Sequence, residues 1–272
     1  MNYLRLNFLI VYFTLHNRNN FIYILPMNNI GFGIFCFGED YYYTGTVEKI
    51  NKLLDQGFHC YILTENPEFF TTKYSNTFLH TIKYDRSFKS YYDKMILPKH
   101  ILKNHDFCIL LDADTYIKDY EFINVLKDYK FKYGITYVDT LMNHPSKIDT
   151  VGKIQMDGTE WNSYKLYVEK LFPPYQSLET IWEYILIINK IGFNQKQFYN
   201  YYEKLQVVKE YAGLTLNKDV NAPGEGISIL ISSKLSNTEI QRDLDLYEKI
   251  KDSMVSISRR FTRPEHLPDF MK

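Results

Sequence analysis

The chain has 272 residues, and its 32 basic and 32 acidic side chains give a formal net charge of zero at pH 7. Without an excess of positive charge there is no electrostatic case for nucleic acid or an anionic membrane surface as the partner. The three cysteines, Cys36, Cys60 and Cys108, lie in apolar runs without disulfide or zinc-site spacing, so we expect buried free thiols in a reducing compartment.

Residues 1–26 differ in pattern from the rest of the chain. Residues 3–15 are mostly apolar but include Arg5 and Asn7, and the apolar run that follows is shorter. Neither run reaches the roughly 20 apolar residues that a membrane-spanning helix needs, and no small-residue cleavage site of a signal peptide follows. We therefore expect Met27 to be the natural start, residues 1–26 to be an extension or weak membrane anchor, and the protein to be cytoplasmic without an integral span.

A regular pattern of strands and helices begins after Met27. Residues 30–37 form an apolar run typical of a strand, and residues 45–56 carry apolar side chains at helical spacing. Gly57 suits the end of that helix, because glycine adopts the left-handed conformation of a helix C-cap. Residues 58–63 then read as a second strand. This βαβ unit predicts two parallel neighbouring strands.

The next elements lead to an acidic motif. Residues 78–83 resemble a third strand, and Ser87 can cap a helix over residues 87–102 that Pro98 would kink. Residues 107–111 form a short apolar run without alternation, as expected of a parallel strand that is covered on both faces.

The second half is more irregular. We expect one α/β domain over residues 27–272, with a mostly parallel sheet between helices and an insertion or lid at residues 139–178, where prolines and glycines gather. The further expected strands cover residues 132–138 and 185–188. The further expected helices cover residues 120–127, 195–207, 227–235 and 237–250.

Asp112 and Asp114 directly follow the strand over residues 107–111. In open α/β sheets ligands collect beyond the carboxyl ends of strands, so these carboxylates should face a crevice. Burial of an unpaired carboxylate costs several kcal/mol, and Mg²⁺ or Mn²⁺ between carboxylates and a substrate's phosphates would remove that cost. The alternative is structural: Asp112 caps the following turn and Asp114 is solvated.

Three segments together resemble the GT-A nucleotide-sugar glycosyltransferases, closest to the glycogenin-like and galactosyltransferase-like branches. They are Gly-Ile-Phe-Cys-Phe-Gly at 33–38, Tyr-Tyr-Asp-Lys-Met at 91–95 and Leu-Leu-Asp-Ala-Asp-Thr at 110–115. The resemblance implies a GT-A fold and a metal-dependent transfer of a sugar from a nucleotide-sugar donor, by default a UDP-sugar, to a glycan or other hydroxyl acceptor. The many aromatic residues, 25 Tyr and 19 Phe, suit a sugar site although most must serve the core.

The resemblance also implies roles for residues that would bind the donor. Phe37 and Gly38, at the end of the first strand, would contact the base and ribose. Lys94 would reach the diphosphate or the sugar, and Ala113 would offer its backbone alone. For Lys94 the structural alternative is a solvated helix residue.

The same resemblance implies a Mn²⁺ or Mg²⁺ site. Asp114 would be the main protein ligand, and Asp112 would contact the metal or the ribose. Glycogenin-like enzymes add a histidine from an H-x-x-G-x-x-K-P-W run, which this chain lacks. His266, in Pro-Glu-His-Leu-Pro, is a possible substitute.

Two glutamates are candidates for the catalytic step. Glu225, in Pro-Gly-Glu-Gly-Ile, resembles the loop acid that approaches the transferred sugar and acceptor, and Glu183 precedes a later strand. A carboxylate could act as the base for the acceptor hydroxyl or assist on the leaving-group face. The structural alternatives are that Glu225 stabilises a helix N-terminus and that Glu183 is a solvated surface residue.

Two other functions remain open. Haloacid-dehalogenase-type phosphatases also place D-x-D after an apolar strand, but usually on an early strand and with Thr or Val where this chain has Tyr116. A GT-A-like protein that binds a nucleotide sugar or glycan without transfer is the second alternative, because the terminal histidine run is missing.

Overall fold

A computed structural model of the chain describes residues 29–38, 40–84, 91–113, 115–139, 183–211 and 225–256. The predicted extension at residues 1–26 lies outside these ranges, as does all but the first residue of the predicted insertion at 139–178. Within the described ranges, no helix is long and apolar enough to cross a membrane.

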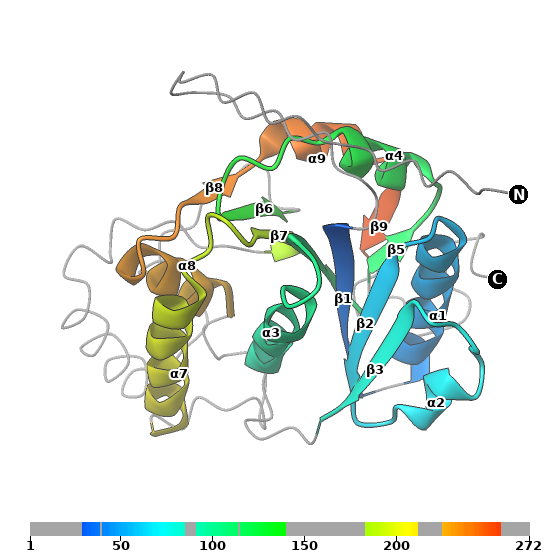
Figure 1. Cartoon of the computed structure of the whole chain (residues 1–272), viewed down its shortest axis with the longest axis horizontal. Helices are drawn as coiled ribbons and strands as arrows, with labels where there is room; N and C mark the ends of the chain where they lie inside the picture. Colours follow the sequence, from blue (N-terminus) through cyan, green and yellow to red (C-terminus); the bar gives the residue numbers. More distant parts are fainter. Residues whose placement is uncertain are drawn as a thin grey trace, which may run out of the picture.

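A seven-stranded sheet forms the centre of the described structure, in the order β3-β2-β1-β4-β7-β6-β8 (Figure 1). β7 runs antiparallel to both of its neighbours, and the other pairs of the sheet are parallel. A smaller antiparallel sheet joins β5 to β9. This mixed, mostly parallel sheet confirms the predicted α/β class. The strands are β1 (Ile30–Cys36), β2 (His59–Thr64), β3 (Leu79–Lys83), β4 (Phe107–Asp112), β5 (Thr115–Ile117), β6 (Ile135–Asp139), β7 (Glu183–Asn189), β8 (Ile240–Arg242) and β9 (Met254–Ser256).

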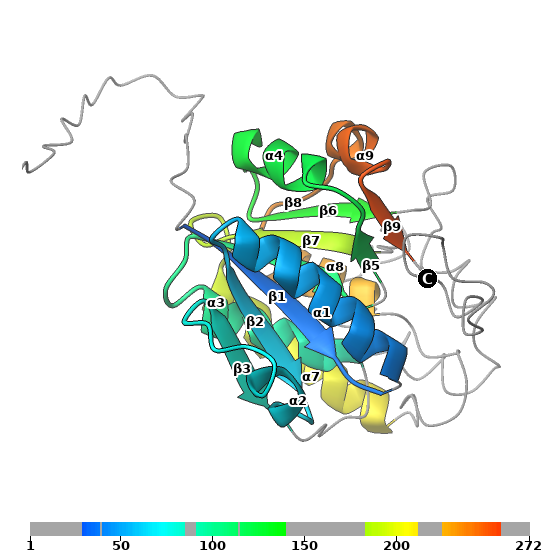
Figure 2. The same ribbon diagram turned by 90° about the vertical axis from the view of Figure 1, so that its right-hand side faces the viewer.

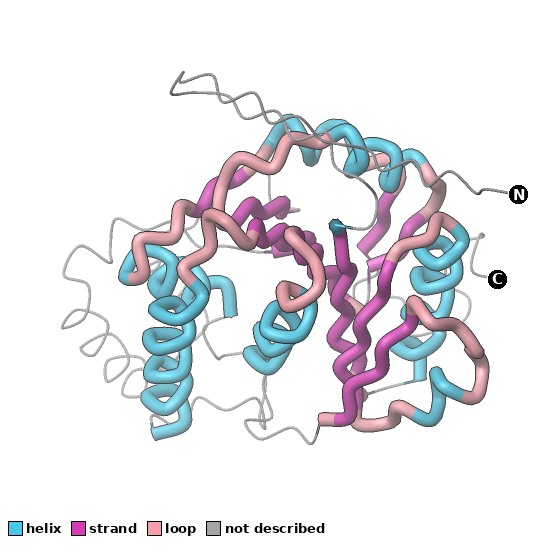
Figure 3. The backbone as a smooth tube through the Cα atoms, in the orientation of Figure 1, coloured by secondary structure: helices cyan, strands magenta, loops and turns pink. Residues whose placement is uncertain are grey.

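Helices cover both faces of the sheet (Figure 3). One core cluster joins one face to α1, α4 and α9, and the other joins the opposite face to α3, α7 and α8. The helices are α1 (Asp40–Asp55), α2 (Glu68–Thr71), the 3₁₀ helix η2 (Tyr91–Ile96), α3 (Leu97–Ile101), α4 (Glu121–Asp128), α7 (Gln195–Tyr211), α8 (Glu225–Leu235) and α9 (Leu244–Ile250).

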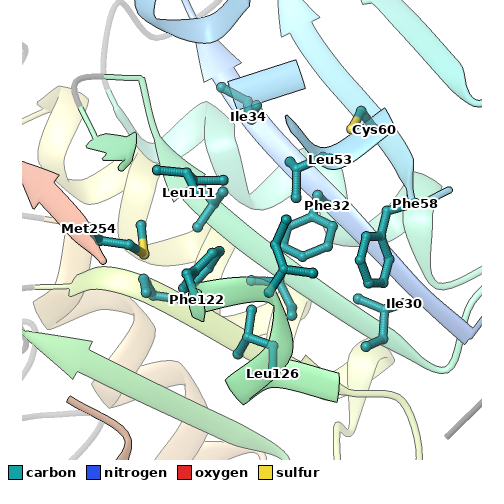
Figure 4. Close-up of a cluster of buried hydrophobic side chains, with 14 of the residues drawn as sticks. Ile30, Phe32, Ile34, Leu53, Phe58, Cys60, Leu111, Phe122, Leu126 and Met254 are labelled. Carbon is teal, nitrogen blue, oxygen red and sulfur yellow. The ribbon is translucent and has the colours of Figure 1, made fainter. Parts of the chain in front are cut away.

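The α1 side of the core is built from large apolar side chains. Figure 4 shows Phe32 of β1, Leu53 of α1 and Phe122 of α4 gathered in one cluster. Each of these three side chains is fully buried. Complete burial of such a side chain stabilises a fold by about 1.5–3 kcal/mol, so this cluster fixes α1 and α4 on the sheet.

The strand order reverses between β1 and β4. The chain runs from β1 to β2 and β3 on one side, then returns to place β4 on the other side of β1 (Figure 2). The pairing sets Phe35 of β1 beside Asp112 of β4. Ligands of open α/β proteins bind at such a switch point, beyond the carboxyl ends of the strands. The fold therefore places Asp112 where a ligand is expected.

The single helix predicted over residues 87–102 is wrong for its described part. Residues 91–96 form the 3₁₀ helix η2, and the α-helix α3 begins only at Leu97. Pro98 lies in the first turn of α3. Proline has no backbone N–H, so it cannot donate to the carbonyl four residues earlier in a continuous α-helix, but it is accepted in a first turn.

The helix predicted over residues 237–250 is wrong in its first part, and its second part is found as α9. Residues 240–242 form β8, which adds a parallel edge strand beside β6, and α9 begins at Leu244. Asn237 has a φ of 54°, a left-handed conformation that ends helix α8. Asp243 then caps α9 by accepting a hydrogen bond from the Leu246 backbone N–H at 2.7 Å.

The remaining predicted elements are found with shifted ends. Helix α1 begins at Asp40, five residues before the predicted start at Gly45, and α7 extends to Tyr211. Gly57 has a φ of 77°, as expected of its predicted role after α1. The three-residue strands β5 and β9 were not predicted, because such short segments carry too few residues for a period to be visible.

A pair of histidines lies near the amino ends of β2 and β3. Nδ1 of His59 and Nε2 of His80 are joined by a 3.0 Å hydrogen bond, and their rings are nearly parallel, at 8°. The ring of His80 also stacks on Tyr61, with centroids 4.4 Å apart. Burial lowers the pKa of both imidazoles, and the charge of His59 lowers the pKa of His80 further.

These lowered pKa values predict how stability depends on pH. The folded protein binds protons at His59 and His80 less tightly than the unfolded chain, in which histidine has a pKa of about 6.5. Above about pH 6.5 both histidines are neutral in both states and do not lower the free energy of unfolding. Below that value the free energy of unfolding should fall, because the unfolded chain takes up protons more readily. Urea unfolding at pH 7.5 and 5.5 should show a smaller fall for His80→Gln than for the wild type. Equal falls in both proteins would contradict this assignment.

Candidate functional site

The carboxyl end of β4 carries an ion pair. Nζ of Lys94 lies 3.1 Å from Oδ1 of Asp112. The Lys94 side chain is 7% exposed and the Asp112 side chain 37% exposed. Lys94 is therefore buried, so the alternative that it is a solvated helix residue is wrong. The partly exposed carboxylate of Asp112 keeps a surface that a ligand can reach.

Close packing of α3 against β1 places Lys94. Gly33 of β1 has no side chain, and a Cβ there would lie 2.6 Å from Leu110 and 2.9 Å from Ile101 of α3. A Cβ at this position would force the Leu110 and Ile101 side chains to shift, so glycine lets α3 pack this closely on β1. Because η2 leads directly into α3, the same contact sets the position of Lys94 on the sheet.

Helix α7 holds η2 from the other side. The Tyr199 hydroxyl donates a 2.7 Å hydrogen bond to the carbonyl of Met95, the residue after Lys94. Burial raises the pKa of the Tyr199 hydroxyl well above its ordinary value, so it remains a donor at physiological pH. Met95 is itself buried in the core. Lys94 therefore projects from a backbone that is fixed from two directions.

A second lysine, which the sequence analysis did not select, lies beneath the same strand end. Lys49 of α1 is fully buried, and its ammonium donates to the carbonyls of Asp112 at 2.8 Å, Ala113 at 2.7 Å and Thr115. The only sequence signal is its place on the inward face of α1, one residue before Ile50. The carbonyl of Ala113 thus binds a lysine of the chain, and the predicted contact of the Ala113 backbone with the donor stays a prediction.

The end of β1 consists of a buried aromatic residue and a glycine, and their contact with the base and ribose stays a prediction. Phe37 is buried, with its ring 4.5 Å from the ring of Phe35. Its ring therefore packs in the core, and its backbone is the part at the sheet edge. Gly38 follows with a φ of 97°, a conformation that glycine adopts without strain. This glycine lets the chain turn away from β1 at the switch point.

The backbones of two further acidic residues, Glu183 and Asp139, lie at the same edge of the sheet. β7 is antiparallel to β4, so its first residue, Glu183, lies at the edge where β4 ends. Glu183 also pairs with Asp139, the last residue of β6. For these two residues the structure describes the backbone alone. The adjacent strands β4, β7 and β6 therefore each bring a carboxylate residue to one edge, and Asp139 was missed because its strand was predicted to end at Val138.

The other candidates fall outside the described parts. Asp114 and His266 lie outside the described residues, and for Glu225, the first residue of α8, the structure describes the backbone alone. Among the described residues no group of three or more His, Cys, Asp or Glu side chains could hold a metal ion. The metal site therefore stays a prediction to which Asp112 contributes a partly exposed carboxylate.

Cys36, the last residue of β1, is a buried thiol at this edge. Burial raises the pKa of its thiol to about 11. A thiol with this pKa is protonated at neutral pH and reacts slowly. Cys36, Cys60 and Cys108 are all free and buried, as the sequence predicted.

A cavity of about 560 Å³ lies elsewhere, between the segment after α4 and the start of α9. Its lining includes Tyr129, Arg242 and Asp243, and none of the predicted site residues contributes to it. Tyr129 donates a hydrogen bond to Asp243, which also caps α9. The hydrogen bonds of Asp243 thus help to hold the start of α9.

Comparisons with known proteins find likenesses among solved structures alone. No protein-family model matches the chain, and no curated protein matches it. The solved structures similar to it include the catalytic domain of Drosophila beta1,4-galactosyltransferase 7 in complex with xylobiose, at 11% sequence identity and a TM-score of 0.41, covering 86% of this chain and 73% of that chain.

A double-mutant cycle tests the Lys94–Asp112 pair. Removal of either charge from a partly buried pair removes their mutual attraction, so we expect a coupling energy of about 1–2 kcal/mol between Lys94→Met and Asp112→Asn. The control is the exposed pair of Lys99 and Glu203, 2.8 Å apart, for which coupling should stay below about 0.5 kcal/mol. Urea unfolding of the single and double variants gives both values. Equal coupling in the two pairs would show that the contact at the sheet edge is no stronger than a surface ion pair.

Proposed function

We propose that the chain is a GT-A nucleotide-sugar glycosyltransferase that moves a sugar from a UDP-sugar to a hydroxyl of a glycan or other acceptor. The observation that carries this proposal is the Lys94–Asp112 pair at the carboxyl end of β4, at the switch point of the sheet. A buried cation and a partly exposed carboxylate at this position suit a ligand that has both phosphate and hydroxyl groups.

The charge of the leaving group explains why cations are needed. Transfer from a nucleotide sugar releases a diphosphate, and positive charge held in place at the site stabilises that developing charge. Lys94 provides one such charge on a rigid segment. In the proposal, Asp112 and Asp114 would hold a Mn²⁺ or Mg²⁺ ion, with His266 as a further ligand, and such an ion would supply positive charge for the departing phosphates.

Asp112 has to serve both Lys94 and the donor. Its contact with Lys94 is made through Oδ1, and its side chain is 37% exposed. A carboxylate has two oxygens and about four lone-pair directions. It can therefore accept from Lys94 and still contact a metal or a ribose hydroxyl, while the backbone of Phe37 and Gly38 borders the nucleotide.

Glu183 and Glu225 remain the proposed catalytic carboxylates. The backbone of Glu183 stands at the same edge as Asp112, which supports a role beside the donor. Glu225 begins α8. In the proposal one of them takes the proton of the acceptor hydroxyl or assists on the leaving-group face.

A thermal-shift series tests the donor site. UDP-, GDP- and CMP-sugars are added with and without Mn²⁺ to the wild type, Asp114→Ala and Asp112→Asn. A ligand at a hundredfold excess over its Kd stabilises the folded state by about 2.7 kcal/mol. We expect a Mn²⁺-dependent rise in Tm with UDP-sugars that both variants lose. The matched control is Asp106→Asn, at the opposite end of β4, which should keep the shift.

Two results would decide against parts of this proposal. If no donor stabilises the wild type, the acidic edge of β4 is structural and the glycosyltransferase assignment falls. If a UDP-sugar binds but is never hydrolysed or transferred, and Glu183→Gln and Glu225→Gln behave as the wild type, the protein is a binding module.

A further inference from the structure

We infer that Lys49 is a positioning residue of the proposed donor site: its buried ammonium fixes the backbone of the loop that follows β4. The inference rests on the proposed function for its consequence, because that loop directly follows Asp112, the last residue of β4. Lys49 is distinct from Lys94, since it lies on α1, on the opposite face of the sheet.

Burial and bonding show that Lys49 is part of this loop's structure. The side chain is fully buried, which for an ammonium is unfavourable unless polar groups replace water. Three carbonyls do so, those of Asp112, Ala113 and Thr115. An ammonium has three N–H donors and no acceptor, so its donors match these carbonyls in number.

The positions of the three carbonyls explain what the contact does. Two lie before residue 114 and one after it, so a single cation gathers both sides of the turn between β4 and β5. Without the ammonium, three carbonyl oxygens would converge with no donor between them. The loop would then have to rearrange, because a buried unsatisfied polar group costs free energy comparable to a lost hydrogen bond.

Asp112 is consequently bound both at its backbone carbonyl and at its side-chain carboxylate. Lys49 binds its carbonyl from the α1 side, and Lys94 binds its carboxylate from the α3 side. The bond to Lys49 holds the peptide plane that follows the Asp112 Cα, and the pairing of Asp112 with Phe35 of β1 holds the residue in the sheet, so together they set the direction of its Cβ. The orientation of the carboxylate toward a donor should therefore depend on Lys49, although Lys49 does not itself reach the crevice.

The helix that carries Lys49 is rigidly seated. Gly45, one turn earlier, packs on Tyr116 so closely that a Cβ would lie 2.3 Å from the Tyr116 hydroxyl. Lys52, one turn later, donates to the carbonyls of Ile117 and Lys118. Lys49 and Lys52 thus make the same kind of bond from one helix, but only Lys49 binds carbonyls of the loop beside Asp112.

This difference supplies a matched pair of variants, Lys49→Met and Lys52→Met. Methionine keeps the length of the side chain and removes the ammonium. Hydrogen exchange followed by mass spectrometry should show at least tenfold faster exchange in residues 113–116 of Lys49→Met, and little change there in Lys52→Met. With UDP and Mn²⁺ as the probe, the Kd should rise at least tenfold in Lys49→Met and stay within about twofold of wild type in Lys52→Met.

Different outcomes separate this inference from the proposed function. If the wild type binds UDP and Mn²⁺ but Lys49→Met keeps wild-type exchange and affinity, or binds Mn²⁺ more tightly, Lys49 does not position the loop. If the wild type binds neither UDP nor Mn²⁺, the proposed function fails, and the exchange contrast alone decides whether Lys49 orders the loop.

Should Lys49→Met fail to fold, the wild type provides the test. ¹H–¹⁵N spectra of lysine ammonium groups should show a slowly exchanging Lys49 signal, because buried N–H groups bonded to carbonyls are shielded from water. That signal should shift when UDP and Mg²⁺ are added. A Lys49 signal that is unchanged at saturating UDP and Mg²⁺ would overturn the inference.

Discussion

Two lysines on opposite faces of the sheet hold the end of β4. Lys49 binds the carbonyl of Asp112 and Lys94 binds its carboxylate, so the residue at the switch point is fixed in both backbone and side chain. Each lysine is buried, a state that is stable only because these oxygens replace water. The packing of α1 and α3 therefore serves a second purpose, since it delivers one cation from each face to the same residue.

This arrangement follows from the order of the strands. Because the chain reverses between β1 and β4, the helix after β1 and the segment before β4 lie on opposite faces, and both begin near the carboxyl edge of the sheet. The antiparallel strand β7 then brings the backbone of Glu183 to that edge from the opposite chain direction. An acidic edge above two buried cations suits a ligand that combines phosphates with hydroxyl groups, which is the chemistry of a nucleotide sugar.

The sequence predicted the features that local patterns encode. The unalternated apolar runs gave β1, β2 and β4 with ends shifted by one residue, and Gly57 marked the end of α1. The predicted strand ended before Asp112, because the carboxylates of Asp112 and Asp114 do not suit the continuation of a buried strand. Lys49 was not found, because a lysine on an inward helix face looks like an interrupted apolar stripe until the carbonyls it binds are known. The 3₁₀ helix before Pro98 and the strand β8 likewise depend on tertiary contacts, since η2 is held by Tyr199 and β8 by its pairing with β6.

The most direct test of the account is a crystal structure grown with UDP and Mn²⁺, with anomalous data that locate the manganese. The account predicts an anomalous peak beside the Asp112 carboxylate, beyond the carboxyl ends of β1 and β4, with the diphosphate next to Lys94 and the nucleoside beside Gly38. UDP and manganese bound at another part of the molecule, or no bound UDP at saturating concentrations of both, would contradict it.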